Sequence, residues 1–251
     1  KPNRDIRALP NLETKFVAAN SLINLETDSD KSDLHFKNAE VEALEKKLFD
    51  IREKIFYTNS RSEKIKLEKR LTELRFRLKD EFTNLGYPND KTDKITSWDP
   101  FDQNTHADWF DPEWMFGIKD GFDIVIGNPP YVSTKGISES DKKILEKQFG
   151  FADDLYTHFY FKGMELLKDH GVLSFITSKT FWTIQTKKNL RTLILKNKLL
   201  QLFDTENPFE AVMVDTCVVL VQKVQDSSAE YSFTYLDGTK NLSKPSLQTG
   251  N

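Results

Sequence analysis

The chain has 251 residues, enough for one large α/β domain or for one domain with an embellishment. Its hydrophobic content of 38% supplies a core, and its formal charge of −3 gives no overall sign of nucleic-acid binding. The single Cys217 excludes an internal disulfide framework and fits a reducing, cytoplasmic location. The four His lack metal-ligand spacing and no apolar run could span a bilayer, so we expect neither a metal site nor a membrane partner.

The first predicted element is a short buried strand over residues 15–22 that ends in Asn20 and Ser21. Residues 37–79 then contain thirteen Lys or Arg and eight Asp or Glu, a local excess of five positive charges. Apolar residues recur there at spacings of three and four on both sides of a polar break at 58–62, which predicts an antiparallel hairpin of two amphipathic helices. A solvated helix face explains this positive excess, and the alternative is a surface that contacts the phosphates of a nucleic acid.

Aromatic residues concentrate in 93–119, with Asp and Pro between them. We expect an irregular segment that its rings hold in place. It leads directly into the most informative stretch of the chain, an apolar strand over 122–126 that is followed by Asn-Pro-Pro-Tyr at 128–131. Ligands of α/β sheets bind beyond the carboxyl ends of strands, which is where this turn falls. The alternative is that the two prolines simply end a buried strand.

The tetrapeptide suits the transfer of a methyl group to a planar amino group, whose delocalised lone pair makes it a poor nucleophile. The side-chain oxygen of Asn128 and the carbonyl of Pro129 could accept both N–H bonds, and these bonds would strengthen in the transition state. Pro129 and Pro130 add no competing N–H donors and fix the backbone. Tyr131 offers a flat face on which a planar group can stack.

The rest of the chain alternates helices with strands, which predicts a doubly wound α/β sheet. Gly171 is expected to take the left-handed conformation that ends the predicted helix over 154–168. The predicted helices cover 138–149, 154–168 and 186–198, and the predicted strands cover 172–177, 199–203, 214–223 and 231–236.

The order of these features resembles the gamma-type adenine-N6 DNA methyltransferases, of the large type II (IIG-like) restriction-modification kind. The segments that carry the resemblance are 9–22, 121–132, 154–159, 171–181 and 207–217. It implies a partial Rossmann-like methyltransferase sheet, with the first strands missing, formed by 1–34 and 86–251. Residues 35–85 would be an inserted amphipathic helical hairpin.

The resemblance implies methyl transfer from S-adenosylmethionine to N6 of an adenine flipped out of double-stranded DNA, within a restriction-modification or phage-defence system. In such enzymes Asn128 and Pro129 bond the amino group, Tyr131 stacks on the base, and Pro130 borders the cofactor adenine. Phe209 falls where the family places a second aromatic opposite the tyrosine, and such stacking suits base flipping. Ordinary packing is the alternative for Phe209.

Two further residues match cofactor positions of the family. Asn20 falls where an acidic or amide residue touches the adenine amino group of the cofactor, although an N-cap of a following helix is equally compatible with it. Phe159 matches a position that packs on the cofactor adenine, and its alternative is a place in the core.

One departure from the family pattern concerns the cofactor loop. No two of the ten glycines are separated by a single residue, so the chain contains no Gly-x-Gly. We therefore expect the N-terminal cofactor loop and the target-recognition region to lie elsewhere in the same polypeptide. We also expect residues 1–251 alone neither to bind S-adenosylmethionine tightly nor to methylate.

Two other functions are compatible with the sequence. Methyltransferases acting on protein glutamine or on RNA face the same chemical problem, because an amide NH2 is an equally poor nucleophile. A non-catalytic DNA-recognition scaffold would use the fold without the reaction.

Overall fold

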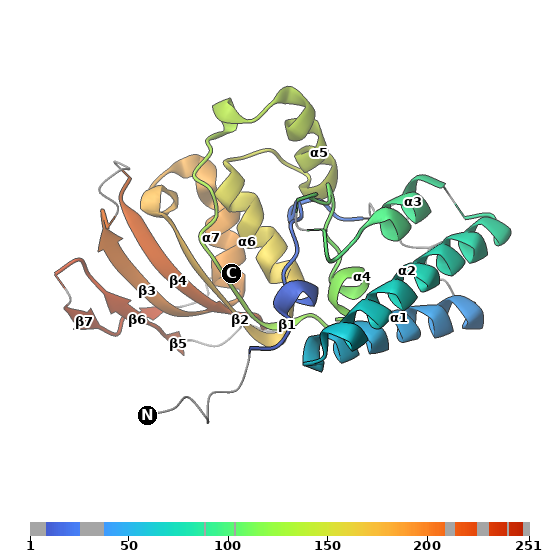
Figure 1. The fold of residues 1–251 in the computed structure, drawn as a ribbon. Coiled ribbons are helices and arrows are strands. Elements are labelled where there is room, and N and C mark those ends of the chain that lie inside the picture. The colour runs from blue at the N-terminus through green and yellow to red at the C-terminus, as the bar shows by residue number, and fades with distance from the viewer. Residues whose placement is uncertain are drawn as a thin grey trace, which may run out of the picture. The chain divides into compact units, whose positions relative to one another are not determined.

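The computed structural model describes residues 9–25, 38–87, 89–102, 104–208, 214–224, 231–239 and 241–247. The chain divides into two compact units, Lys1–Lys119 and Asp120–Asn251 (Figure 1). Each unit has its own hydrophobic core. The sequence-based division into 1–34 with 86–251, and 35–85 as an insertion, stays a prediction.

The first unit is built on a pair of long helices. α1 spans Ala39–Tyr57 and α2 spans Arg61–Asn84, and the three residues between them leave room only for an antiparallel pair. Each helix begins at a side-chain cap: Asn38 accepts from the backbone of α1, and Ser60 accepts from the Glu63 nitrogen of α2. The predicted helical hairpin is therefore confirmed. The shorter elements of this unit are η1 (Leu12–Thr14), α3 (Asn89–Ser97) and α4 (Pro112–Phe116).

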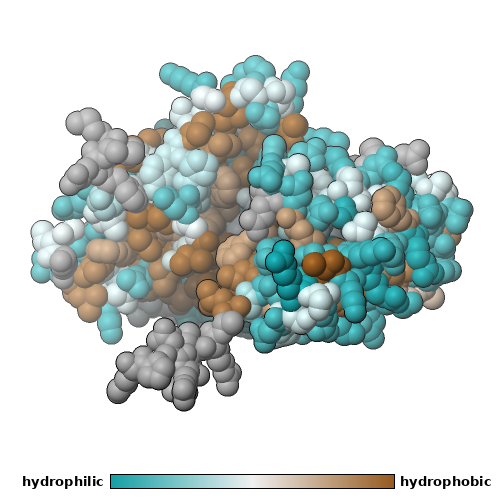
Figure 2. Space-filling model, in the orientation of Figure 1, coloured by the Kyte–Doolittle hydropathy of each residue, from teal (hydrophilic) through white to brown (hydrophobic). Residues whose placement is uncertain are grey.

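The surface of the helical pair is largely hydrophilic, as Figure 2 shows over α1 and α2. Several of its basic side chains are already paired within the unit. Lys64 lies 2.6 Å from Glu13, and Arg75 lies 3.1 Å from Asp99. These pairs are what a solvated helix face would form, and the phosphate-following alternative stays a prediction.

Aromatic rings hold the segment 93–119 against the helical pair. Trp109 is buried and meets Trp98 edge-on at 6.3 Å, while Trp114 meets Phe82 of α2 at 6.1 Å. The expectation of a ring-pinned segment is confirmed. It is not irregular throughout, because α3 extends into it as far as Ser97.

The predicted buried strand over 15–22 is wrong. Residues 12–14 form a 3-10 turn, and the only β contact of 15–22 is an isolated bridge from Ala19 to Ala107. Phe16 is 62% exposed. A strand requires a continuous hydrogen-bonded neighbour, and the described residues of this unit offer only single bridges.

The second unit is a mixed sheet with helices. Its sheet order is β1-β2-β4-β3-β6-β7; β1 runs parallel to β2, and β4 lies antiparallel between β2 and β3 (Figure 1). This is a Rossmann-like α/β sheet, and the predicted fold class is confirmed. The strands are β1 (Phe122–Gly127), β2 (Leu167–Ser178), β3 (Lys198–Glu206), β4 (Thr216–Gln222), β6 (Thr234–Leu236) and β7 (Leu242–Ser243), with β5 (Tyr231–Ser232) and β8 (Ser246–Leu247) paired separately. The helices are α5 (Glu139–Phe149), α6 (Leu155–Leu166) and α7 (Lys188–Lys196), and the 3-10 turns are η3 (Thr134–Gly136), η4 (Lys179–Trp182) and η5 (Gln185–Lys187).

Helices α6 and α7 cover one face of the sheet. α6 and α7 contact each other and share a core with inward residues of β2, β3 and β4, such as Phe175 and Val219. On β1, Ile124 and Ile126 point away from this core and are 65% and 79% exposed. A doubly wound sheet needs helices on both faces, and that arrangement stays a prediction.

The end of α6 also differs from the expected glycine terminus. The left-handed residue is His170 (φ 63°), and Gly171 belongs to β2 instead. A Cβ at Gly171 would lie 2.9 Å from the carbonyl oxygens of Lys168 and Phe122. This glycine therefore permits the close approach of β2 to β1 rather than a helix cap.

Candidate active site

Parallel pairing of β1 and β2 brings two chain segments to the same edge of the sheet. Gly127, the last residue of β1, is in register with Phe175, so the tetrapeptide 128–131 emerges beside the end of β2. Asn128 is exposed and Tyr131 is half-buried. Between them, Pro129 is buried and Pro130 is exposed.

The amide of Asn128 is accessible. Its Oδ1 accepts a hydrogen bond from the Tyr131 hydroxyl at 3.2 Å, and that hydroxyl also lies 3.4 Å from the carbonyl of Ile176. No backbone group of the described chain saturates the Asn128 side chain, and none donates to the Pro129 carbonyl. Burial raises the pKa of Tyr131, so its hydroxyl stays protonated and can donate at neutral pH.

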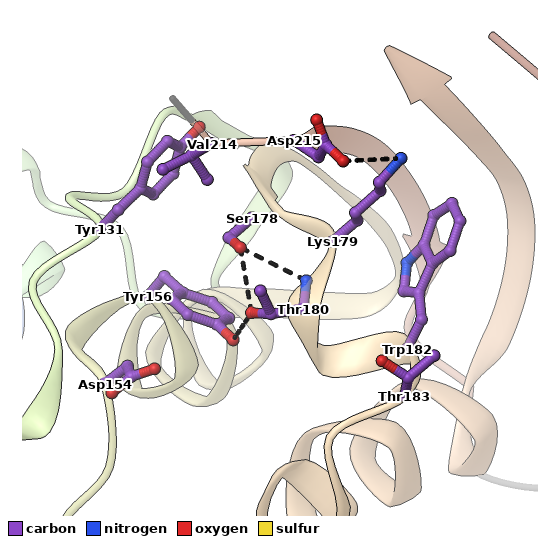
Figure 3. A pocket seen from close by; sticks show the side chains of 10 residues that line it. All are labelled: Tyr131, Asp154, Tyr156, Ser178, Lys179, Thr180, Trp182, Thr183, Val214 and Asp215. Carbon is purple, nitrogen blue, oxygen red and sulfur yellow. Dashed lines mark hydrogen bonds and ion pairs between the residues drawn. The ribbon is translucent and has the colours of Figure 1, made fainter. Parts of the chain in front are cut away.

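A pocket of about 600 Å³ opens beside Tyr131 (Figure 3). This volume is within the range of small-molecule sites in proteins. Its walls come from the start of α6, the end of β2 with η4, and the residues just before β4. The lining residues are Tyr131, Asp154, Tyr156, Ser178, Lys179, Thr180, Trp182, Thr183, Val214 and Asp215.

One wall of the pocket is a chain of hydroxyl groups. The Thr180 hydroxyl lies 3.0 Å from Ser178 Oγ and 3.3 Å from the Tyr156 hydroxyl. Ser178 Oγ also accepts from the Thr180 backbone nitrogen at 3.3 Å (Figure 3). Hydroxyls both donate and accept, so this wall can meet either kind of polar atom on a ligand.

The same turn, η4, also brings a paired cation to the pocket. Lys179 Nζ lies 3.2 Å from Asp204 and 3.4 Å from Asp215, and 6.0 Å from the centre of the Trp182 ring. Burial alone would lower the pKa of Lys179, but the two carboxylates outweigh it and raise the pKa. A wall with a compensated charge suits an uncharged planar group better than a phosphate.

Sequence reasoning placed Tyr131 in this site but missed the residues around it. Tyr156, Ser178 and Thr180 lie in segments that carry the family resemblance, but none of them was predicted as a site residue. For Ser178 and Thr180, the signal that could have found them is position: residues at the end of a strand parallel to β1 lie at the same sheet edge as the tetrapeptide.

The predicted cofactor residues are divided between the units. Asn20 belongs to the first unit, where its Oδ1 accepts from the Leu22 nitrogen at 3.3 Å. This is an asparagine turn, and since residues 21–25 are not helical, the N-cap alternative is wrong. Pro130 and Phe159 belong to the second unit. Phe209 lies outside the described residues.

Apolar surface suited to a cofactor ring remains at the second unit. Pro130 is exposed, and Phe159 is only half-buried against the core. Both therefore keep surface on which a planar ring could pack, and their roles at an S-adenosylmethionine site stay predictions.

Two absences hold for the described part of the chain. It contains no group of three or more His, Cys, Asp or Glu side chains arranged to hold a metal ion. None of its helices is long and apolar enough to cross a membrane.

Comparisons with known proteins identify a matching family and several relatives. Residues 11–210 match the family described as Eco57I restriction-modification methylase. Relatives include the type II restriction enzyme and methyltransferase RM.Eco57I of Escherichia coli, 27% identical over 146 residues. The type II methyltransferase M.VspI of Vibrio sp. (strain 343) is 24% identical over 128 residues. The alignments cover 53% and 50% of this chain but 13% and 31% of those proteins, so the chain spans less than a third of either relative.

A solved structure gives a partial likeness. The methyltransferase subunit of a type I restriction-modification system from Streptococcus thermophilus aligns with 63% of this chain and 36% of that chain. The sequence identity is 17% and the TM-score is 0.39.

Proposed function

Because this chain belongs to the Eco57I restriction-modification methylase family, we propose that it carries the catalytic centre of a DNA methyltransferase that acts on adenine N6. The observation that carries the proposal is the accessible amide of Asn128, next to Tyr131 and its pocket. A cytoplasmic location is part of the proposal.

The reaction needs a nitrogen that can attack. The Asn128 side-chain oxygen and the Pro129 carbonyl would each accept one N–H of the adenine amino group. As the nitrogen bonds to the methyl carbon it gains positive charge and its N–H bonds become more acidic, so both hydrogen bonds strengthen toward the transition state. Since Asn128 is exposed, the proton that N6 loses can pass from its oxygen to water.

The base would enter the pocket beside Tyr131 after it leaves the DNA stack. A pocket of about 600 Å³ accommodates a purine, and the Tyr131 ring supplies the stacking that the base loses. The lining holds two carboxylates, Asp154 and Asp215, against one lysine, Lys179, and this charge balance favours a neutral base over a phosphate. Double-stranded DNA is therefore the proposed partner.

S-adenosylmethionine would supply an electrophilic methyl group on a sulfonium, whose carbon–sulfur bond would break to leave a neutral thioether. In this chain, Pro130 and Phe159 would pack on its adenine ring, and Asn20 would bond the adenine amino group. Phe209 would face Tyr131 across the base. These four roles follow from the resemblance.

We further propose that other regions of the same polypeptide complete the enzyme. β1 is the edge strand of its sheet in the described chain, and it exposes Ile124 and Ile126 there. An exposed apolar edge strand requires cover. With no Gly-x-Gly in the sequence, residues 1–251 alone should neither bind S-adenosylmethionine tightly nor methylate. Calorimetry that showed micromolar binding to this chain would contradict this.

The test of the proposed function is substitution of Asn128 by Ala in the complete protein. Tritium transfer from S-adenosylmethionine to adenine-containing duplex DNA should be abolished, whereas cofactor binding should be largely retained, because the lost bonds form mainly in the transition state. Asn59→Ala, an exposed residue of the turn between α1 and α2, is the matched control and should leave transfer unchanged.

The same assay separates the alternatives. If the wild type transfers the methyl group to release factor or to ribosomal RNA but not to duplex DNA, the substrate is that protein or RNA and not DNA. If the wild type and the Asn128→Ala variant both fail to methylate any of these while DNA binding persists in both, the protein is a recognition scaffold.

A further inference from the structure

The loop that follows Tyr131 is fastened to the start of α6. The Thr134 backbone nitrogen donates to Asp154 Oδ1 at 2.8 Å, and the Thr134 hydroxyl donates to the same oxygen at 3.1 Å. The Leu155 nitrogen donates to the Val132 carbonyl at 2.9 Å. Three hydrogen bonds thus join residues 132–134 to 154–155.

Asp154 is in turn held by a buried lysine. The other carboxylate oxygen of Asp154 lies 2.6 Å from Lys187 Nζ, which also pairs with Asp153. The Lys187 side chain is only 5% exposed, and its ammonium lies 5.2 Å from the centre of the Tyr156 ring. A cation at this depth is costly unless its partners are fixed, so the lysine and the carboxylates hold each other in place.

The protonation states agree with this arrangement. Burial raises the pKa of Asp154, but the bonds from Lys187 and Thr134 outweigh burial and lower it. Burial lowers the pKa of Lys187, and its two carboxylate partners reverse this. Both groups are therefore charged at neutral pH.

This chain of contacts ends at the aromatic residues of the pocket. Tyr131 lies three residues before Thr134, and Tyr156 lies two residues after Asp154; both rings line the pocket. Lys187 is not among the lining residues, so it can act on a bound base only through its partners.

We propose that Lys187 and Asp154 are positioning residues, which hold the loop of Tyr131 so that its ring meets the flipped base. The inference rests on the proposed function and extends it to residues outside the Asn-Pro-Pro-Tyr motif. Misplacement of a stacking group by about 1 Å is enough to reduce a rate on the order of 10²-fold.

The experiment compares Lys187→Met and Asp154→Asn with the wild type, all as the complete protein. Lys142→Met is the matched control, because Lys142 forms a 2.6 Å pair with Glu139 on the surface of α5 in the same unit. Hydrogen exchange at the Thr134 amide reports the attachment of the loop. Fluorescence of 2-aminopurine, placed at the adenine that the protein methylates, reports flipping, and single-turnover transfer reports the rate.

Lys187→Met should accelerate exchange at Thr134 at least tenfold, weaken the fluorescence increase and reduce transfer on the order of 10²-fold. Asp154→Asn should follow in the same direction, and Lys142→Met should leave all three unchanged. A folded Lys187→Met protein with wild-type exchange, or with faster exchange but wild-type flipping and transfer, would overturn the proposal.

Two further outcomes are separable. If Lys187→Met does not fold, Asp154→Asn decides the matter, because an amide oxygen can still accept from Thr134 while the charge that faces Lys187 is gone; normal flipping in this variant would refute the positioning role. If the wild type itself transfers no methyl group to adenine, the proposed function fails. The positioning proposal fails alone only when the wild type methylates and the variants match it.

Discussion

Replacing Tyr131 by Phe and by Ala separates the contribution of its ring from that of its hydroxyl. The hydroxyl bonds at 3.2 Å to Asn128 and at 3.4 Å to the carbonyl of Ile176 are both long, so only the first should contribute substantially. A neutral hydrogen bond at this length is worth about 0.5–1 kcal/mol, or roughly two- to fivefold in rate. Tyr131→Phe keeps the ring and should lose only that factor.

Tyr131→Ala also loses the stack, which is worth roughly 1–3 kcal/mol per base. Together with the hydroxyl, the expected loss is about 1.5–4 kcal/mol, from roughly tenfold to 10³-fold. Single-turnover methyl transfer by the complete protein measures both variants, and 2-aminopurine fluorescence assigns the loss to flipping. A wild-type rate for Tyr131→Ala would remove stacking from the mechanism, and equal losses in the two variants would assign the effect to the hydroxyl.

Three predictions concern stability. Burial lowers the pKa of His158 to about 4 in the folded protein, from a usual value of 6.5. Between these two values the unfolded state binds more protons than the folded state, so stability falls as the pH falls. Urea titrations should show about 2–3 kcal/mol of stability lost between pH 7 and 4.5. In His158→Gln this part of the pH dependence should disappear. Gly121→Ala should cost roughly 2 kcal/mol or more in urea titrations, because at φ 87° its Cβ would lie 2.7 Å from a backbone nitrogen of β2. Gly150→Ala, with φ 79° and open space, should cost about 1 kcal/mol, and equal losses would contradict the steric argument. Burial raises the pKa of Glu45 to about 7, so its ionisation lowers stability as pH rises from 4.5 to 7; Glu45→Gln should raise the melting temperature at pH 8 and not at pH 4.

The sequence predicted the features that local patterns determine. Spacings of three and four placed α1 and α2, and polar residues at 38 and 60 were available to cap them. The apolar run 122–126 correctly placed a strand, and the Asn-Pro-Pro-Tyr after it led us to propose the end of that strand as the site. These signals are local because helix caps, turns and strand ends depend on residues only a few positions apart.

Features that depend on distant partners could not be predicted in this way. Residues 15–22 have the composition of a strand, yet strand formation requires a neighbour that sequence composition does not reveal. The wall formed by Ser178 and Thr180 follows from the parallel register of β1 and β2, and the contact of Lys187 with Asp154 spans more than thirty positions. His170, not Gly171, takes the left-handed conformation, and Gly171 instead permits the close packing of two strands, a need that depends on a distant strand.

The position of β4 has a consequence for synthesis of the chain. β2 and β3 precede β4 in the sequence but touch it on either side, so the two earlier strands have no direct contact with each other in the sheet. Until the ribosome has made residues 216–222, β2 and β3 each keep an unpaired edge where β4 will bind. The wall of the pocket that carries Asp215 has also not yet formed. A nascent chain stalled before this point would therefore present the Asn-Pro-Pro-Tyr turn without a finished cavity, and would be a natural target for chaperones.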